Sequence, residues 1–493
     1  MLTKWDSAFS KNDIRGVYGK DITEELYYFV GKSYIKYILT LSNKNVNDLW
    51  ITVCRDARNH SLSLSESLIK GIISTGANVV DLGLAPTPIG YYSNVVGVNI
   101  EENCDEIDGA LIVTASHNPS QYNGLKMTYN GLLLDEKPIQ ELLKIVAEVS
   151  KTVSLPDALG KVVKYDLIPD YTDVMKLKFG KIGSGLKIVV DSANGTGGVV
   201  APNLYRALGC EVIELYSNPD GAFPNHHPNP SDEKTLDDIK NAVVKNHADF
   251  GIAFDGDSDR IGIIDSQGNS MTGDKLLLIY ALDIIEKYKG SGTLPKVVSE
   301  VKCSQVLFDT INNCGGEAIM CKTGHGFIKA KMKEINAVLG GEMSGHVFFK
   351  DKYYGFDDAV YAGCRMIEIV SKHKQQNNSF KVEELLAPFN KIFSSQEVRL
   401  SCPNELKKQV LEQFEQKLNN NSNMFSAKIK DIITLDGMRI VFDGGFALIR
   451  QSNTEPVFTL RFEAKTKAQC EKFENVMVST VEEIVNNCKA IVH

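Results

Sequence analysis

Three carboxylates stand at every second position of the segment DGDSDR, at Asp255, Asp257 and Asp259. In an extended segment such residues point to one face, and three oxygen donors on one face suit a hard cation such as Mg²⁺ or Ca²⁺. An EF-hand loop begins with the same spacing, but it needs Gly at its sixth position and Glu at its twelfth. This chain has Arg260 and Ser266 there, so the segment is not an EF-hand. A solvated acidic turn is the alternative, which the flanking apolar runs disfavour because burying unpaired charge is costly.

The segment TASHNP places a serine beside a histidine, Ser116 and His117, in a turn-forming context. One interpretation is a hydrolase nucleophile with its base, but adjacent residues rarely face each other well, and no GxSxG elbow surrounds the serine. A second is a serine that carries a phosphoryl group, which would bring about two negative charges. A simple turn is the third, since Ser, Asn and Pro all favour turns.

Two further polar segments have the chemistry of ligand-binding loops. GEMSGH offers Glu342, Ser344 and His346 at alternating positions, a set that suits sugar hydroxyls, and its glycines let the backbone approach a ligand closely. RQSNT, at 450–454, combines a guanidinium, two hydroxyls, an amide and backbone N–H groups, which suit a phosphate clamp. A glycine-rich turn and a polar hairpin loop are the respective alternatives.

Three stretches of the chain share a plan that would position these loops. Each begins with an apolar, strand-like run, at 49–54, 186–190 and 297–301. A helix-length segment follows, and Leu62–Ser74 shows the apolar residues at helical spacing. A second strand-like run then leads into TASHNP, DGDSDR or GGEMSGH, at 110–113, 250–254 and 337–339. The alternation predicts α/β units with mostly parallel sheets, in which ligands bind beyond the carboxyl ends of strands.

The C-terminal part of the chain predicts a separate α+β domain. Its elements are a strand at 398–400, a helix at 404–418, strands at 432–442, 446–449 and 457–464, and a terminal helix from Lys467. The segment Lys372–Ser379 before it is polar and poor in apolar residues, as expected of a linker.

The composition excludes several classes of protein. The chain has 493 residues, of which 43% are hydrophobic and 24% charged, and at about 150 residues per domain this length predicts three or four globular domains. The net charge of −8 argues against a broad nucleic-acid-binding surface. Ten cysteines without zinc-like spacing are typical of buried thiols in a reducing compartment. Without a visible signal or membrane span, we expect a cytoplasmic protein with no nucleic-acid or membrane partner.

The four polar loops, in this order, resemble those of the α-D-phosphohexomutase superfamily. The resemblance runs from DIRG (13–16) to RFEA (461–464) and covers nearly the whole chain. GEMSGH resembles the loop of the phosphomannomutase/phosphoglucomutase group, whereas phosphoglucosamine mutases usually have Gln in place of Met343 and many phosphoglucomutases have GEESFG. PDGAFPNHHPNP (219–230) and LRFEA (460–464) indicate the same group.

The resemblance implies an α/β fold of three related domains, with mixed or parallel sheets, and a C-terminal α+β domain, all around one central cleft. The implied domains are a phosphoserine domain at 1–154, a metal-binding domain at 155–268, a sugar-binding domain at 269–378 and a phosphate-binding domain at 379–493.

The resemblance also implies a reaction. Ser116 would carry a phosphoryl group and pass it to a hexose 1-phosphate or 6-phosphate of mannose or glucose. The resulting 1,6-bisphosphosugar would turn around and return its other phosphoryl group. The implied cofactors are Mg²⁺ and hexose 1,6-bisphosphate, as activator and intermediate. The implied partners are small-molecule sugar phosphates, and the oligomeric state stays open.

Residues of this chain that match the family's motifs take roles by the same resemblance. The catalytic residues would be Ser116, Lys126, Arg15 and His117. The metal ligands would be Ser116 through its phosphate, Asp255, Asp257 and Asp259. The substrate would be bound by Arg260, Lys302, Thr323, Gly324, His325, Glu342, Ser344 and His346. The phosphate clamp would be Arg450, Ser452, Asn453 and Thr454. Lys126 is the favoured group for proton transfer, because arginine stays protonated.

Two positions depart from the family pattern and bear on fine specificity. Asn12 stands where many close relatives have Tyr, and Gln451 stands where some have a small residue. Three alternatives stay open at this point. A phosphoglucosamine mutase is disfavoured by Met343, a metal-dependent sugar phosphatase would release phosphate, and a non-catalytic sugar-phosphate-binding protein would need a damaged phosphoserine site.

Overall fold

The computed structural model describes residues 4–10, 13–100, 106–151, 159–452 and 455–492. The chain forms two compact units. Unit 1 comprises Met1–Gly273 and Ser344–Val382, and unit 2 comprises Asp274–Met343 and Glu383–His493. None of the described helices combines the length and the apolar character needed to cross a bilayer.

The first sheet of unit 1 is mixed. In spatial order its strands are β1 (Ile14–Val17), β5 (Tyr122–Tyr129), β4 (Gly109–Val113), β2 (Trp50–Arg55), β3 (Asn78–Leu84) and β7 (Val162–Lys164), with β6 (Leu132–Leu133) on β5. Strands β4, β2, β3 and β7 run parallel, whereas β5 is antiparallel to β1 and β4. Because β2 and β4 are parallel neighbours, the loops that follow them lie at one edge of the sheet.

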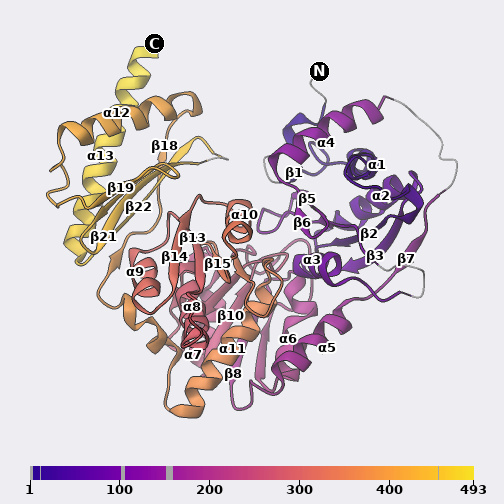
Figure 1. Ribbon diagram of the computed structural model, residues 1–493, viewed down its shortest axis with the longest axis horizontal. Coiled ribbons are helices and arrows are strands. Elements are labelled where there is room, and N and C mark those ends of the chain that lie inside the picture. The colour runs from indigo at the N-terminus through magenta and orange to yellow at the C-terminus, as the bar shows by residue number, and fades with distance from the viewer. Residues whose placement is uncertain (1–3, 11–12, 101–105, 152–158, 453–454, 493) are drawn as a thin grey trace. The chain divides into compact units, whose positions relative to one another are not determined.

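Helices cover this sheet as its apolar faces require (Figure 1). They are α1 (Glu24–Leu39), α2 (Ser61–Ile73), α3 (Thr87–Val96) and α4 (Glu136–Val149). Apolar residues of α1, α2 and α4 share one core with the sheet, and Leu64 and Leu68 of α2 are fully buried there. The helical spacing predicted for 62–74 is therefore confirmed as the buried face of α2.

The second sheet of unit 1 presents the acidic segment. Its strands, in spatial order, are β12 (Ser270–Met271), β11 (Ile261–Ile264), β10 (Phe250–Phe254), β8 (Lys187–Asp191) and β9 (Glu211–Leu215). Its helices are α5 (Ile168–Phe179), α6 (Ala201–Ala207), α7 (Asp237–Lys245) and α11 (Ala359–Gln376). The predicted linker at 372–379 is wrong in part, because Lys372–Gln376 forms the last turns of α11.

Unit 2 begins with a parallel sheet. Its strands are β14 (Glu317–Cys321), β13 (Lys296–Glu300) and β15 (Leu339–Gly341), and its helices are α8 (Gly273–Tyr288), α9 (Gln305–Asn313) and α10 (His325–Ile335). The strand predicted at 337–339 begins two residues later, at Leu339. The strand β16 (Val347–Phe349) follows in unit 1.

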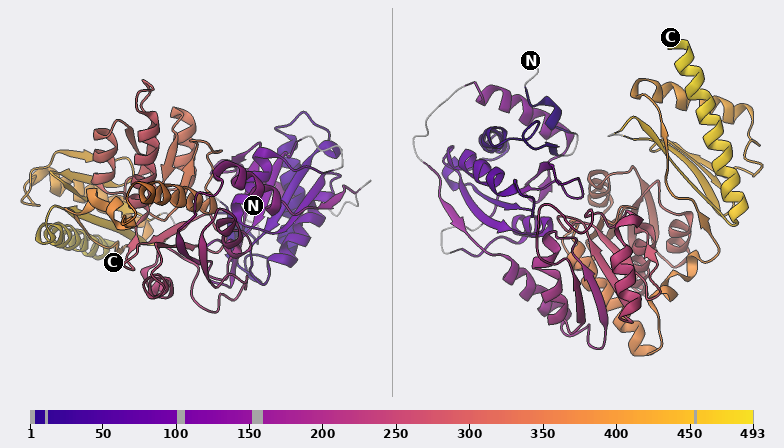
Figure 2. Two further views of the ribbon diagram at one scale, coloured as in Figure 1. Left: turned by 90° about the horizontal axis from the view of Figure 1, so that it is seen from below. Right: turned by 180° about the vertical axis from the view of Figure 1, so that it is seen from behind.

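The C-terminal part of unit 2 is an antiparallel sheet with two helices on one core. The elements are β17 (Phe393–Ser394), β22 (Val457–Ala464), β21 (Gly445–Gln451), β20 (Met438–Phe442), β19 (Asp431–Ile433), β18 (Val398–Ser401), α12 (Lys407–Asn420) and α13 (Lys467–Val492). Figure 2 shows α13 lying along this sheet. The single strand predicted at 432–442 is wrong. It is two strands joined by a turn in which Gly437 has a φ of +78°.

Short 3-10 helices complete the secondary structure. They lie at Asp6–Ala8, Val46–Asp48, Thr196–Val199, Glu233–Thr235, Val382–Phe389 and Asn404–Leu406.

Two buried arginines join the parts of unit 2. The Arg439 guanidinium lies 3.6 Å from the ring centre of Phe446 and donates to the carbonyl group of Cys303 at 2.8 Å. Arg461 lies 3.3 Å from the Asp274 carboxylate. In these contacts each buried charge has a partner. Separating the two sheets of unit 2 would leave buried charges unpaired, which is costly.

The crossing of α1 and α2 depends on two glycines. A Cβ on Gly71 would lie 2.1 Å from the carbonyl oxygen of Tyr28, and one on Gly31 would lie 2.4 Å from that of Leu68. We expect Gly71→Ala to lower the free energy of unfolding by about 1–3 kcal/mol through overpacking. Gly326→Ala is the control, because a Cβ there meets no atom within 4 Å. Equal thermal unfolding of Gly71→Ala and the unaltered protein would contradict the expectation.

Candidate functional site

The DGDSDR segment is a tight turn between the antiparallel strands β10 and β11. Its carboxylates, Asp255, Asp257 and Asp259, are at most 1% exposed and bring oxygen atoms within 4.8 Å of one another. The extended conformation predicted for this segment is wrong, since Ser258 has a left-handed φ of +60°. The carboxylates converge because the backbone curls. Asp255 Oδ1 accepts the main-chain N–H groups of Asp259 and Arg260, both at 3.1 Å.

Ser116 meets this acidic turn from the loop after β4. Its Oγ donates to Asp255 Oδ2 at 2.6 Å, and its main-chain N–H donates to Thr114 Oγ1 at 2.9 Å. The residue is buried and has a left-handed φ of +50°, which costs a non-glycine residue about 1–2 kcal/mol. Such strain persists only where the surroundings determine it, and it is concentrated at functional sites.

The adjacent histidine does not form the main contact of the serine. His117 Nδ1 lies 3.3 Å from Ser116 Oγ, closer than expected for neighbours in sequence. Burial, together with the guanidinium groups of Arg260 and Arg15, holds the pKa of His117 well below its usual value. The shorter contact of the hydroxyl is with Asp255. Ser116 is therefore oriented by the acidic turn, which disfavours the serine–histidine hydrolase.

A buried lysine and a partly buried arginine lie close to the acidic turn. Lys126, on β5, places Nζ 2.8 Å from Asp257 Oδ2 and also contacts Asp259. Burial alone would lower the pKa of Lys126, but the two carboxylates outweigh burial and raise it well above its usual value. Arg15, on β1, donates to Asn118 Oδ1 at 2.9 Å and so reaches the same loop as Ser116.

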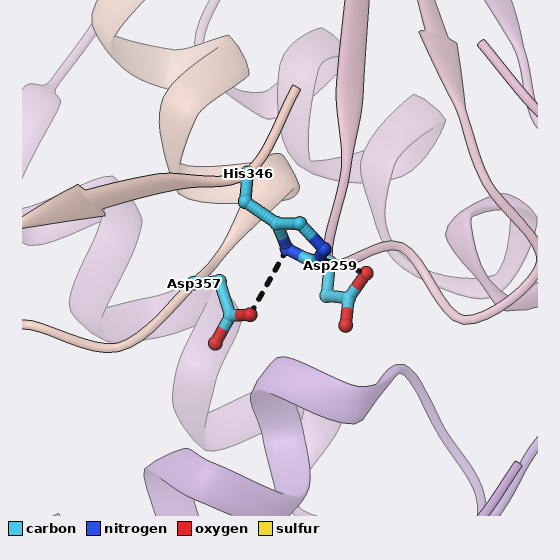
Figure 3. Close-up of side chains that lie close together, drawn as sticks. All are labelled: Asp259, His346 and Asp357. Carbon is cyan, nitrogen blue, oxygen red and sulfur yellow. Dashed lines mark ion pairs between the residues drawn. The ribbon is translucent and has the colours of Figure 1, made fainter. Parts of the chain in front are cut away.

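A histidine and an aspartate border the acidic turn (Figure 3). His346 lies between two carboxylates, with Nδ1 3.0 Å from Asp357 Oδ2 and 3.7 Å from Asp259 Oδ1. Arg260 Nε donates to His346 Nε2 at 2.9 Å. Because Nε2 accepts, the proton of a neutral ring belongs on Nδ1, which faces Asp357. The two contacts fix the orientation of the imidazole.

The acidic turn has the donor chemistry of a divalent-cation site. Among the described atoms, Oδ1 of Asp257 and Oδ1 of Asp259 are buried and accept no hydrogen bond. Burial and the two neighbouring carboxylates raise the pKa of Asp255 well above its usual value. Buried carboxylate oxygens without such partners are costly, and a hard cation with oxygen ligands relieves both the repulsion and the desolvation.

Unit 2 holds a second set of the predicted residues. Glu342 Oε1 accepts the N–H of Gly324 at 2.8 Å, and Gly324 has a φ of +129° just before α10. Lys302 Nζ lies 3.7 Å from the carboxylates of both Glu300 and Glu397. His325 is the first residue of α10.

The predicted phosphate clamp is partly described. Arg450, in β21, donates through Nε to Asp436 Oδ2 at 3.1 Å, and the same oxygen accepts the N–H of Thr323 at 3.1 Å. Asp436 therefore links the clamp arginine to the loop before α10. Ser452 follows β21. Two predicted clamp residues lie outside the described part of the chain, Asn453 and Thr454.

The GEMSGH segment does not have the regular alternation expected of it. Met343 and Ser344 form a turn and Gly345 has a φ of +91°, so Glu342, Ser344 and His346 do not lie along one strand. The carbonyl group of Ser344 accepts from Ser231 Oγ at 2.8 Å.

The sequence analysis did not find residues that contact the site but lie far from it in the chain. Thr87 is an example. Its Oγ1 donates to Asp257 Oδ2 at 2.6 Å, and its N–H donates to the Asp257 carbonyl oxygen at 2.9 Å. Thr87 begins α3, directly after the loop that ends β3. The sequence could have indicated this loop, because it also lies at the carboxyl end of a parallel strand, but not its partner Asp257.

Four family models match the chain and together cover most of it. They are the phosphoglucomutase/phosphomannomutase alpha/beta/alpha domains I, II and III, at residues 6–153, 169–268 and 272–389, and the C-terminal domain, at 397–479. The chain belongs to the phosphoglucomutase/phosphomannomutase family. It is therefore an enzyme of the mutase class with four domains, as the sequence predicted.

Individual relatives are similar over nearly their whole length. A phosphomannomutase/phosphoglucomutase of Pseudomonas putida is 39% identical over 474 residues, which are 96% of this chain and 94% of that protein. A phosphoglucomutase of Neisseria gonorrhoeae is 37% identical over 476 residues, 96% of each chain. The crystal structure of a phosphoglucomutase/phosphomannomutase family protein from Burkholderia thailandensis matches with a TM-score of 0.85 and 32% identity over 98% of both chains.

The contact of Thr87 with the acidic turn predicts a role in cation binding. If the acidic turn holds a divalent cation, Thr87→Val should weaken its binding, probed with Mg²⁺, about 10- to 100-fold, as loss of a partner that orients a ligand usually does. The measurement is the Mg²⁺ concentration needed to raise the melting temperature. The control is Thr52→Val, because Thr52 Oγ1 is also buried but contacts Ser93 Oγ at 2.7 Å. Equal Mg²⁺ dependence of the two variants would refute the role of Thr87.

Proposed function

We propose that the protein interconverts the 1-phosphates and 6-phosphates of mannose and glucose by passing a phosphoryl group through Ser116. The observation that carries the proposal is a strained, buried serine hydroxyl 2.6 Å from a turn of three buried carboxylates. A hydroxyl beside a cation-binding turn can carry a phosphate, provided that nearby charges balance the added oxygens.

The balance of charge supports a phosphorylated serine. Phosphate on Ser116 would add about two negative charges to those of the three aspartates. A divalent cation and the three cations Lys126, Arg15 and Arg260 would together match this total. Lys126 is buried, Arg15 is partly buried, and Arg260 is within 4.0 Å of the Asp255 carboxylate. Phosphate alone or a divalent cation alone would leave a net charge of about two, whereas the two together keep the site neutral.

We propose Mg²⁺ as the cation, held by Asp255, Asp257 and Asp259 together with the phosphate of Ser116. When bound, it would stabilise the charge that develops on the phosphoryl oxygens during transfer. Thr87 orients Asp257, and main-chain N–H groups of the turn orient Asp255.

In the proposed transfer, the bond between Ser116 Oγ and phosphorus breaks as a sugar hydroxyl oxygen bonds to phosphorus. The attacking hydroxyl loses its proton. Lys126 keeps its own proton between two carboxylates, so we assign it charge balance and not the proton transfer favoured from the sequence. We assign the proton to Nε2 of His346, whose ring Asp357 orients. This assignment requires that Arg260, which donates to Nε2 at 2.9 Å, moves to the phosphate. Ser116 Oγ departs without a proton. It then takes the other phosphoryl group of the bisphosphosugar, and His346 returns its proton to the sugar oxygen that leaves.

We further propose that a second group of residues binds the sugar and its spectator phosphate in both orientations. The hydroxyls and cations in this group suit phosphate oxygens, and Glu342 suits sugar hydroxyls. The residues are Arg260, Lys302, Thr323, Gly324, His325, Glu342, Ser344, His346, Arg450, Ser452, Asn453 and Thr454.

The domain assignments follow from these roles. We propose that residues 1–154 supply the phosphoserine, 155–268 the metal ligands, 269–378 the sugar loop and 379–493 the phosphate clamp. We also propose that hexose 1,6-bisphosphate activates the enzyme and that it works in the cytoplasm. The nine described cysteines are all free thiols, which is typical of proteins in a reducing compartment.

Substrate choice tests the proposal directly. Purified protein is given mannose 1-phosphate, glucose 1-phosphate or glucosamine 1-phosphate, with Mg²⁺ and a trace of glucose 1,6-bisphosphate. We expect the 6-phosphates of mannose and glucose to form without net release of phosphate. Fastest turnover of glucosamine 1-phosphate would indicate a phosphoglucosamine mutase, and stoichiometric phosphate release would indicate a phosphatase. Either result would overturn the proposed function.

Removal of the serine hydroxyl tests the phosphoryl carrier. We expect Ser116→Ala to lower kcat by about a thousandfold or more, because it removes the group that forms the covalent intermediate. Ser33→Ala is the matched control, since the Ser33 hydroxyl is buried in α1 and makes no hydrogen bond within the described part of the chain. Mutase activity of Ser116→Ala close to that of Ser33→Ala would exclude Ser116 as the carrier.

A further inference from the structure

Arg58 lies in the loop between β2 and α2. Its guanidinium donates hydrogen bonds to main-chain carbonyl groups of the loop that contains Ser116. Nη2 donates to the carbonyl oxygens of Ser116 at 2.8 Å and Asn118 at 2.6 Å. Nη1 donates to those of Pro119 at 2.7 Å and Tyr122 at 3.0 Å. The side chain is 1% exposed. One planar guanidinium thus satisfies four carbonyl groups of a loop that carries the proposed phosphoserine.

The guanidinium is itself fixed before it meets the loop. Asp56 Oδ2 accepts from Arg58 Nε at 3.0 Å, and Asp56 Oδ1 accepts from the Arg58 N–H at 3.1 Å and from Ser61 Oγ at 2.6 Å. The ring of Phe223 lies 5.2 Å from the guanidinium carbon. A side chain held in this way loses little further entropy when it binds the loop.

The Ser116 peptide is confined from two sides. Its carbonyl oxygen accepts from Arg58, and a Cβ on Gly256 would lie 2.6 Å from that same oxygen. The backbone of the acidic turn therefore packs directly against the peptide that Arg58 holds. Ser116 has the left-handed φ of +50° at this point, a conformation that relaxes unless its surroundings oppose the change.

We infer that Arg58 is a positioning residue for phosphoryl transfer, which keeps the Ser116 main chain in the strained conformation that aims Oγ at the acidic turn. The inference rests on the proposed function. The hydrogen bonds of the guanidinium described above are to main-chain carbonyl groups and to Asp56, so Arg58 acts through the loop. In this it differs from Lys126 and Arg260, which face the carboxylates.

A positioning role has a kinetic signature that a merely structural arginine lacks. Sugar-phosphate recognition is assigned to other residues, so loss of Arg58 should lower kcat and leave KM nearly unchanged. Misplacing a reacting group by about 1 Å can slow a reaction about 100-fold. We therefore expect Arg58→Ala to lower kcat about 100-fold, and guanidinium ion to restore part of this loss.

The experiment compares Arg58→Ala, Arg58→Lys and Arg365→Ala in the full-length protein. Arg365 is the matched control, because it is equally buried and contacts the Asp351 carboxylate at 3.2 Å and the Phe349 ring. Each variant is tested for kcat, KM and phosphate uptake from glucose 1,6-bisphosphate. The assays are repeated with guanidinium chloride far below the concentrations that unfold proteins. Arg58→Lys keeps the charge but cannot reach four carbonyl groups, and it serves if Arg58→Ala does not fold.

We expect both Arg58 variants to lose kcat and phosphate uptake, guanidinium to restore Arg58→Ala, and Arg365→Ala to lose stability only. Folded Arg58 variants with unchanged kcat would overturn the inference. So would an equal loss in Arg365→Ala, or a folded Arg58→Ala that guanidinium does not restore. Ser116→Ala, assayed in parallel, distinguishes failure of the proposed function from failure of the role of Arg58. If that variant stays active, the proposed function fails, whereas an inactive Ser116→Ala beside an active Arg58→Ala refutes the role of Arg58 alone.

Discussion

Three buried carboxylates in one short turn repel one another, and much of unit 1 is arranged to oppose that repulsion. Asp255 receives two main-chain N–H groups, Asp257 receives the Thr87 hydroxyl, and Lys126 lies between Asp257 and Asp259. These partners still leave buried oxygens without hydrogen bonds among the described atoms. These groups therefore stabilise the turn only in part, and a divalent cation would give the remaining oxygens a partner.

The serine depends on the same turn. Its hydroxyl is directed by Asp255, and its carbonyl group is enclosed between Arg58 and the backbone at Gly256. Both loops come from the carboxyl ends of strands, where parallel sheets place their ligands. A phosphoryl group on this serine would enter a site already rich in cations, which limits the reorganisation that each transfer requires.

Sequence reasoning predicted the local parts of this arrangement. The apolar runs gave strands close to β2, β8, β10 and β13, because burial on both faces leaves a strong signal. The convergence of the three aspartates was expected from an extended backbone, whereas the structure achieves it with a turn at Ser258. A residue other than glycine in the left-handed conformation cannot be recognised from the sequence. The extended conformation expected for this segment therefore could not be corrected from neighbouring residues.

Long-range partners were beyond sequence reasoning for a different reason. Thr87 and Asp257 are 170 positions apart, and Arg58 and Ser116 are 58 apart. Asp357 contacts His346, and Asp436 contacts Arg450. No spacing rule connects the residues of either pair. Such contacts arise from the order of strands in the sheets and from the packing of loops at their ends. Only the structure specifies these features.

The central claim is that Ser116 carries the phosphoryl group beside the acidic turn. Its most direct test is peptide mass spectrometry of the protein after incubation with glucose 1,6-bisphosphate and Mg²⁺. We expect a single added phosphate of about 80 Da on the peptide that contains Ser116. This phosphate should be lost when a hexose phosphate without bisphosphate is supplied in excess. Phosphate on any other residue, or a protein that turns over substrate while Ser116 stays unmodified, would contradict it.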